Sequence, residues 1–232
     1  MRSPLKSIPD WVRVSLPWQD IGGLSAPSKM PCFSYSLPAQ ACKVGSKMRL
    51  IPGSVCSQCY ACKGCYTFPD TVRAMDRRLR AVQAMLSDSA KYETYKDSFC
   101  AVLDVLRARY FRWFDSGDIV DVAHLEAIVE IAARMPRVKF WLPTREYATV
   151  RQYLKLTVGH ALPPNLCVRL SAPMIDGRIG TGRNISGCAT STVHEHADPI
   201  GKVCYAYKRG GSCGNCRACW NPDMVNVSYP KH

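Results

Sequence analysis

One stretch of the sequence decides the fold: Tyr110-FRWFDSGDIVDVAHLEAIVEIAARMPRVKFWLPT-Arg145. It begins with a short apolar run, 110–115, that is typical of a buried strand. The next segment, 121–135, carries apolar residues every three or four positions, which predicts an amphipathic helix. A second apolar run, 138–143, predicts another strand. A strand, a helix and a strand in this order form a βαβ unit, in which the two strands run parallel.

The same alternation extends on both sides of this stretch. Upstream, Pro69 begins one helical pattern and 90–108 forms another. Downstream, a helix is expected over 145–157, a strand over 165–171 and one further strand over 187–194. Repeated strand–helix units favour a parallel sheet covered by helices. We therefore expect an α/β protein built as a parallel (βα) partial or incomplete TIM-like barrel.

Composition divides the chain into three parts. Residues 1–66 are irregular and rich in cysteine, 67–200 hold the (βα) core, and 201–232 form a second cysteine-rich segment. At 232 residues, of which 47% are apolar, the three parts can share one substantial core as a single domain. There is no run of about 18 apolar residues and no apolar export segment, so we expect a cytoplasmic protein without a membrane partner.

The chain has 13 cysteines, and without an export signal this number favours metal-bound thiolates over disulfides. The clearest set is Cys204-YAYKRGGS-Cys213-GN-Cys216-RA-Cys219-Trp220. Three close thiols with a fourth nearby are typical of an iron–sulfur cluster, most simply [4Fe-4S]. Zinc is the alternative, but its two ligand pairs are usually a dozen or more residues apart. Gly214 would let backbone amides approach the sulfurs, and Trp220 would shield them from water.

A second set lies near the other end of the chain: Cys56-SQ-Cys59-YA-Cys62-KG-Cys65. All four thiols could bind one cluster. Alternatively, Cys56 and Cys59 could combine with the upstream Cys32 and Cys42. We therefore expect one or two clusters in the chain.

Polar side chains follow each of the three regular strands: Asp115, Ser116 and Asp118, then Thr144, Arg145 and Glu146, and finally Arg169. Ligands of parallel α/β folds bind at the carboxyl ends of the strands. These residues are therefore candidate catalytic residues that would bind a small polar or phosphorylated substrate. The alternative is structural: Asp118 or Asp121 would cap a helix, and Arg145 and Glu146 would form a first-turn pair.

The formal net charge of +13 raises nucleic acid as a partner. The thiolates of two clusters would reduce this charge to roughly +9. Arg73, Arg77 and Arg80 share one side of the first predicted helix, as either a solvated face or a phosphate-binding stripe. The stretch from His194 to His196 is a weaker candidate for metal binding. Nothing in the sequence predicts the oligomeric state.

Four motifs together resemble the gene-product-88-like family of bacteriophage proteins: Pro52-GSVCSQCYACKGCYTFPD, Phe111-RWFDSGD, Phe140-WLPTRE and Cys204-YAYKRGGSCGNCRACW. The resemblance spans about residues 32–220. It implies a phage origin and expression in the cytoplasm of an infected bacterium, but no established reaction. Cys42, Cys56, Cys59 and the four C-terminal cysteines match the family pattern, whereas Cys62 and Cys65 depart from it.

More distantly, cysteines ahead of a (βα) series resemble the partial barrels of radical S-adenosylmethionine enzymes. The chain lacks the CxxxCxxC loop of those enzymes, so the radical chemistry is not transferred. The sequence therefore predicts a phage iron–sulfur protein that is redox-active or enzymatic. The alternative is a metal-stapled protein that binds nucleic acid or a host partner without catalysis.

Overall fold

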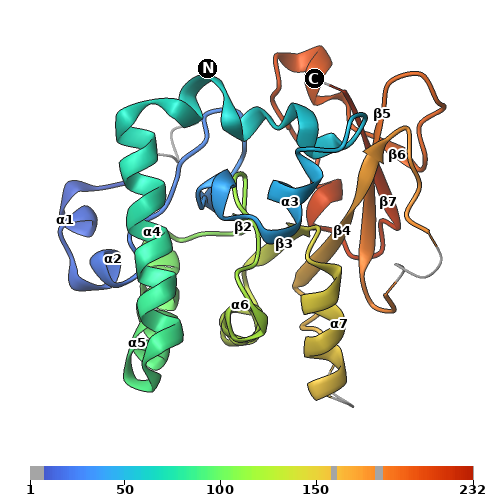
Figure 1. Ribbon diagram of the computed structural model, residues 1–232. Coiled ribbons are helices and arrows are strands. Elements are labelled where there is room, and N and C mark those ends of the chain that lie inside the picture. Colours follow the sequence, from blue (N-terminus) through green and yellow to red (C-terminus); the bar gives the residue numbers. More distant parts are fainter. Residues whose placement is uncertain (1–7, 158–160, 181–184, 232) are drawn as a thin grey trace.

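The computed structural model describes residues 8–157, 161–180 and 185–231. Within these ranges the chain forms one parallel sheet flanked by helices (Figure 1). The strands are β1 (Phe33–Tyr35), β2 (Tyr110–Trp113), β3 (Lys139–Thr144), β4 (Leu166–Ile175), β5 (Ala189–His194), β6 (Lys202–Val203) and β7 (Asn226–Pro230). They lie in the order β1-β2-β3-β4-β5-β7-β6, and every neighbouring pair is parallel.

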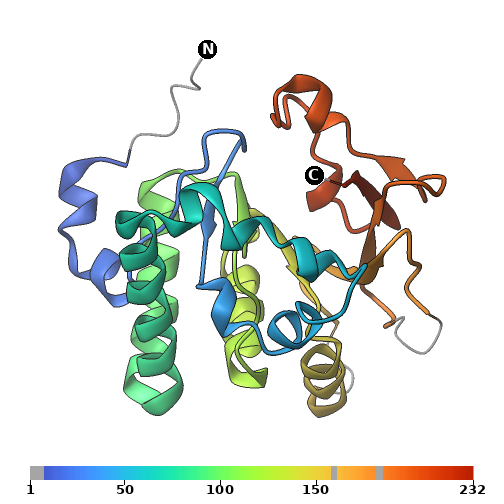
Figure 2. The same ribbon diagram turned by 45° about the horizontal axis from the view of Figure 1, so that its top comes forward.

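The α-helices are α1 (Asp10–Arg13), α2 (Leu16–Asp20), α3 (Lys43–Met48), α4 (Pro69–Ser87), α5 (Ser89–Val105), α6 (Val122–Arg134) and α7 (Tyr147–Leu156). The helices α4 and α5 lie between β1 and β2, α6 lies between β2 and β3, and α7 lies between β3 and β4. Because these strands are neighbours and such crossovers keep one hand, the connecting helices fall on one side of the sheet. Figures 1 and 2 show α5, α6 and α7 on that side.

The α/β class and the parallel sheet are confirmed. The predicted strands 110–115, 138–143 and 165–171 correspond to β2, β3 and β4, and the predicted helix 121–135 corresponds to α6. No closed barrel is seen within the described ranges, where β1 and β6 form the two edges of the sheet. The strand β1 was not predicted, because its three residues lie inside the cysteine-rich part of the chain.

The two faces of the sheet pack against different parts of the chain. In β3, Phe140 and Leu142 belong to the large core beneath the helices, whereas Trp141 packs against Trp220 and Cys32 on the other face. This alternation follows from the two-residue period of a strand. The C-terminal segment therefore covers the helix-free face, and Figure 2 shows it opposite α6 and α7.

A buried aromatic cluster fixes β1 and β2 against α5. Phe99 stacks on Trp113 with ring centroids 4.7 Å apart, and Tyr35 packs against both rings. Aromatic pairs of this kind contribute about 0.5–1.5 kcal/mol each beyond the burial of their area. The cluster gives a rigid base to the carboxyl ends of β1 and β2, where the polar residues begin.

Candidate metal and substrate site

Asp115, directly after β2, anchors the N-terminal cysteine-rich loop. One carboxylate oxygen accepts a 2.6 Å hydrogen bond from the Ser36 hydroxyl, and the other accepts a 2.8 Å bond from the Tyr66 hydroxyl. The Tyr60 hydroxyl donates to the backbone carbonyl of the same aspartate. Asp115 is buried and both of its oxygens are engaged. Its contacts therefore hold the loop that contains Cys56 to Tyr66 against the end of the sheet.

Asp118 joins the ends of β2 and β3. Its Oδ1 accepts hydrogen bonds from the Thr144 hydroxyl at 2.6 Å and from the Ile119 backbone N–H at 2.8 Å. Its Oδ2 accepts from the Arg145 backbone N–H at 2.9 Å. Thr144 Oγ1 in turn accepts from the Glu146 N–H at 2.9 Å. The structure thus brings four of the predicted residues into one hydrogen-bonded group.

Asp118 and Asp121 were both considered as helix caps, and of these two residues Asp121 is the one that caps a helix. Asp121 accepts from the His124 N–H at 2.8 Å at the start of α6. Asp118 instead crosses to the next strand, as described above. The two aspartates therefore have different roles, which their spacing in the sequence did not separate.

The pKa of Asp118 is raised to about 6. Burial is the largest cause, and the hydrogen bonds from Arg145, Thr144 and Ile119 act in the opposite direction. A carboxyl group with a pKa near neutrality can hold or release a proton at physiological pH.

Ser116 and Arg145 complete the group at the strand ends. Ser116 is buried, and its hydroxyl has no hydrogen-bond partner within the described ranges. Arg145 is partly exposed and donates from Nε to the Ala172 carbonyl at 3.4 Å. The charge of its guanidinium also acts on the thiol of Cys56.

Glu146 connects this polar group to Cys42. Its Oε1 accepts a 2.9 Å hydrogen bond from the Val44 N–H, in the first turn of α3. Cys42 immediately precedes that helix. Burial raises the pKa of the Cys42 thiol, and the nearby charge of Asp118 raises it further, ahead of Cys59, Cys56 and Glu146.

Cys42 and Cys56 meet beside Gly45 of α3. A Cβ atom added to Gly45 would lie 3.6 Å from the Cys42 sulfur and 3.7 Å from the Cys56 sulfur. Burial raises the pKa of Cys56, and among the neighbouring charges Arg145 lowers it whereas Cys59 raises it. Cys42 and Cys56 therefore lie together beside Gly45, with Cys59 nearby.

Cys32 lies near the amino ends of the strands, at the opposite end from Cys42. Its neighbour Phe33 is in register with Phe111, near the start of β2, and Cys32 packs against Trp141 and Trp220. The thiols around Gly45 lie beyond the carboxyl ends of the strands, next to Glu146. A strand rises about 3.3 Å per residue, so the two positions are separated by much of the sheet's length. The structure thus places Cys32 beside the C-terminal segment and not with Cys42.

The four C-terminal cysteines lie close to one another. The pKa of Cys219 is raised to about 12, chiefly by burial and in small part by the thiols of Cys204 and Cys213. Burial likewise raises the pKa of Cys213, to which Cys204 and Cys216 add. The Cys219 sulfur also lies 3.2 Å from the Tyr229 hydroxyl. Cys204 and Cys213 thus lie near Cys219, and Cys204 and Cys216 lie near Cys213, on the helix-free face.

Glycines and an aromatic side chain shape the same segment. Gly210, Gly211 and Gly214 have φ values of 59°, 85° and 53°, a conformation that favours glycine. Trp220 is buried, donates from Nε1 to the Phe111 carbonyl at 2.8 Å and packs beside Cys219. Gly214 thus lies in the turn that carries Cys213 and Cys216, and Trp220 lies beside Cys219.

Arg169 does not lie at the carboxyl edge of the sheet, contrary to expectation. Strand β4 continues to Ile175, so Arg169 falls within the strand, and its side chain is fully buried. Its guanidinium donates to four backbone carbonyls at 2.7–3.2 Å, those of Thr190, Met224, Ala218 and Asn221. Arg169 therefore fastens the C-terminal segment to the sheet. It does not lie at the carboxyl ends of the strands, where the substrate site was predicted.

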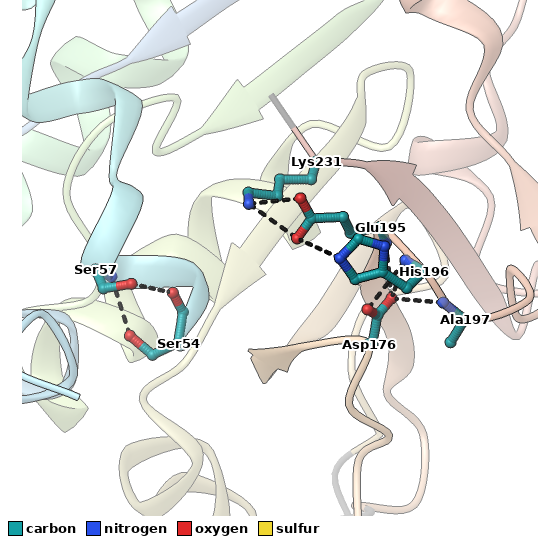
Figure 3. Close-up of polar contacts among 7 residues, drawn as sticks. All are labelled: Ser54, Ser57, Asp176, Glu195, His196, Ala197 and Lys231. Carbon is teal, nitrogen blue, oxygen red and sulfur yellow. Dashed lines mark hydrogen bonds and ion pairs between the residues drawn. The ribbon is translucent and has the colours of Figure 1, made fainter. Parts of the chain in front are cut away.

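The stretch from His194 to His196 is engaged in other contacts. Asp176 accepts hydrogen bonds from the backbone N–H groups of Glu195, His196 and Ala197 (Figure 3). His194 contacts the Ser228 hydroxyl through Nδ1 at 2.7 Å, and His196 is largely exposed. The two histidines thus have different surroundings.

Arg112 is a residue of the helix-free face that sequence reasoning missed. It donates to the Tyr60 hydroxyl at 3.3 Å, and its guanidinium lies 4.3 Å from the centre of the Trp141 ring. It also contacts the sulfur of Met30 at 3.3 Å. An arginine in the middle of a buried strand is the sequence signal that could have identified it.

Across residues 8–157, 161–180 and 185–231, no group of three or more His, Cys, Asp or Glu side chains has an arrangement that could hold a metal ion. Both groups contain several cysteine thiols, the ligand type of iron–sulfur clusters, and the N-terminal group also lies beside Asp118 and Glu146. The space that a Cβ would fill beside Gly45 is also next to two of the sulfurs. None of the helices in the described ranges has the length and apolarity needed to cross a membrane.

The chain matches the family model described as gene product 88 over residues 17–222. No curated protein and no solved structure matches it. The distant resemblance to radical S-adenosylmethionine enzymes is therefore not supported by a match. The family model spans nearly the whole chain, including both groups of cysteines and the polar strand ends. The chain belongs to the gene product 88 family.

Proposed function

We propose that this chain is a bacteriophage iron–sulfur protein with one cluster at each of its two thiol groups. We further propose that it is redox-active or enzymatic toward a small polar or phosphorylated molecule at the carboxyl ends of the strands. One observation carries this proposal: Cys42 and Cys56, from separate segments, meet around Gly45 beside Asp118 and Glu146. Such a site requires thiols and polar side chains at one place.

The spacing of the cysteines along the chain favours a cluster over zinc. Cys213, Cys216 and Cys219 would supply three ligands at intervals of three residues, with Cys204 a short loop away, which is typical of an iron–sulfur cluster. A closed zinc site usually takes two ligand pairs that are a dozen or more residues apart.

The chain's own residues have distinct tasks in this proposal. When bound, the cluster would supply one-electron chemistry. Asp118 would hold or release a proton at its carboxylate, because its pKa is about 6. Arg145 would pair with an anionic group of the substrate, since it is partly exposed and acts on Cys56. Glu146 would keep Cys42 in place through α3.

The partial barrel is part of the same proposal. Consecutive parallel strands from β1 to β5, with helices on one side, give a sheet that can curve around its helix-free face. The proposal also includes a bacteriophage origin and expression in the cytoplasm of the infected host. Both are inferred from the family assignment.

The alternative is a nucleic-acid-binding protein in which zinc or clusters serve only as structural staples. The net charge of +13 favours it, as does a cavity of about 380 Å³ whose lining includes Arg77, Arg80 and Lys91. This reading predicts retention on heparin that falls steeply with salt. Replacing Arg77 and Arg80 would then abolish binding, whereas changing Asp118 would not affect it.

Anaerobic purification followed by iron, zinc and acid-labile sulfide analysis separates the two readings. The proposal expects a brown protein with iron and sulfide in equal amounts, about four of each per cluster. Stoichiometric zinc without sulfide would contradict it and support the alternative.

A further inference from the structure

The N-terminal loop forms a row of cysteines. Residues Val55–Gln58 and Tyr60–Cys62 form two short 3₁₀ turns. The Cys59 N–H donates to the Cys56 carbonyl at 3.2 Å, and the Cys62 N–H donates to the Cys59 carbonyl at 3.1 Å. Each of these hydrogen bonds closes a turn, which brings the Cα atoms of residues three positions apart to within about 7 Å. Cys59 lies between the two 3₁₀ turns, with φ −56° and ψ 115°, and the turns on either side of it bring each of Cys56, Cys59 and Cys62 near the next.

Cys42 joins this row from a different segment. It precedes α3, and the Glu146 carboxylate fixes that helix through the Val44 N–H. As described above, the sulfurs of Cys42 and Cys56 both lie within 4 Å of the Cβ position of Gly45. A fixed helix and a fixed loop thus present their thiols to the same space.

Cys62 interacts with the row through its neighbour. Its thiol is hydrogen-bonded to the Cys59 side chain, and Cys56 lies near it. The three side chains are therefore close together, in agreement with the turn geometry.

Two other cysteines lie outside this set. Beyond Cys62, Lys63 is extended, with φ −139° and ψ 170°, and Cys65 in the following turn is exposed. Cys32 is only 5% exposed and packs against Trp141 and Trp220, near the starts of β2 and β3. The choice between Cys32 and Cys62 is therefore decided by position along the strands.

We propose that Cys42, Cys56, Cys59 and Cys62 are the four thiolate ligands of the N-terminal site, which takes a cubane iron–sulfur cluster. This ligand set combines the upstream Cys42 with three members of the C-x-x-C-x-x-C loop. It rests on the proposed function, which supplies the cluster. Two of its ligands follow Cys56 at intervals of three residues, the same spacing as Cys213, Cys216 and Cys219 at the other site. Each end of the chain would thus carry three closely spaced ligands and one separate ligand.

Single alanine variants of the full chain test the assignment. Cys62→Ala and Cys42→Ala are compared with the matched controls Cys65→Ala and Cys32→Ala after anaerobic purification. Iron and sulfide per chain and the electron paramagnetic resonance spectrum of the reduced protein are the readouts. Far-ultraviolet circular dichroism and the melting temperature identify any variant that fails to fold.

We expect Cys62→Ala to lose about half of the iron and sulfide, as Cys42→Ala does, because one of two clusters is lost. Cys65→Ala should keep the wild-type amounts and spectrum, and folded Cys32→Ala should do the same. Wild-type iron in Cys62→Ala, with loss in folded Cys32→Ala, would overturn the ligand set and leave the proposed function intact. A wild-type protein without iron and sulfide would instead overturn the proposed function together with this assignment.

Discussion

The Tyr66 hydroxyl donates a 2.8 Å hydrogen bond to the Asp115 carboxylate, which fastens the cysteine-rich loop to the end of β2. Ser36 donates to the other oxygen of the same carboxylate. The loop has few other regular contacts, since it consists of short 3₁₀ turns. The position of its thiols therefore depends on this carboxylate.

The first prediction concerns Tyr66→Phe. The change removes a hydrogen bond to a charged acceptor, so we expect the loop to lose about 1.5–3 kcal/mol of local stability. Hydrogen exchange of the backbone N–H groups over 56–66 should become faster, and iron retention should fall. Tyr207→Phe, which alters an exposed tyrosine, is the control. Unchanged exchange in Tyr66→Phe would show that the hydrogen bond does not hold the loop.

The second prediction concerns Gly45→Ala. Alanine normally stabilises a helix relative to glycine by about 0.5–1 kcal/mol. Here the new methyl would lie 2.9 Å from the Cys42 Cβ and within 4 Å of two sulfurs, so we expect loss of cluster and lower stability instead. Gly180→Ala is the matched control, because its Cβ would meet nothing within 4 Å. Iron content and the melting temperature measure the effect, and a stabilised variant with full iron would contradict the prediction.

The third prediction concerns Arg169→Met. The variant keeps a long side chain but leaves four buried carbonyls without their donor, so we expect a loss of about 3 kcal/mol or more. Limited proteolysis should cut first within the C-terminal segment, which the arginine fastens to the sheet. Arg137→Met, at an exposed arginine, should change little. Equal resistance of both variants would contradict the role assigned to Arg169.

Much of the fold could be predicted because its signals are local. The apolar periods of 110–115 and 121–135 gave β2 and α6, and the alternation of such units predicted the parallel sheet. The strand β1 could not be predicted, because three residues among turn-forming neighbours carry no period. The length of β4 was underestimated, and this moved Arg169 from the edge of the sheet to its interior.

The sequence predicted which residues come together at the strand ends better than it predicted what each of them contacts. That Asp118, Thr144 and Glu146 come together follows from parallel strands ending at one edge. Asp115 accepts hydrogen bonds from Ser36 and Tyr66 on its two carboxylate oxygens. These contacts join segments that are distant in the sequence, so no local pattern reveals them. The same holds for the separation of Cys32 from Cys42.

The fourth prediction concerns the pH dependence of stability through His124. Burial lowers the pKa of this histidine to about 3, against 6.5 for the free side chain. The unfolded chain therefore binds a proton between these values that the folded chain does not, so stability is full above pH 6.5 and falls as the pH decreases toward 3. Between pH 7 and pH 5 the loss should be about 2 kcal/mol.

His124→Asn tests this dependence. The imidazole Nδ1 accepts from the Val120 N–H at 3.3 Å, and the asparagine oxygen can take over as acceptor without titrating. The free energy of unfolding, measured by urea titration at pH 7 and pH 5, should therefore differ less for the variant than for the wild type. An identical difference in both proteins would show that His124 does not titrate as described.

The Mössbauer spectrum of the ⁵⁷Fe-labelled protein, purified without oxygen, tests the central claim most directly. The account predicts the quadrupole doublets of tetrahedral, sulfide-bridged iron, with an amount of iron that corresponds to two clusters per chain. A spectrum without such iron, from a protein that instead carries stoichiometric zinc, would contradict it.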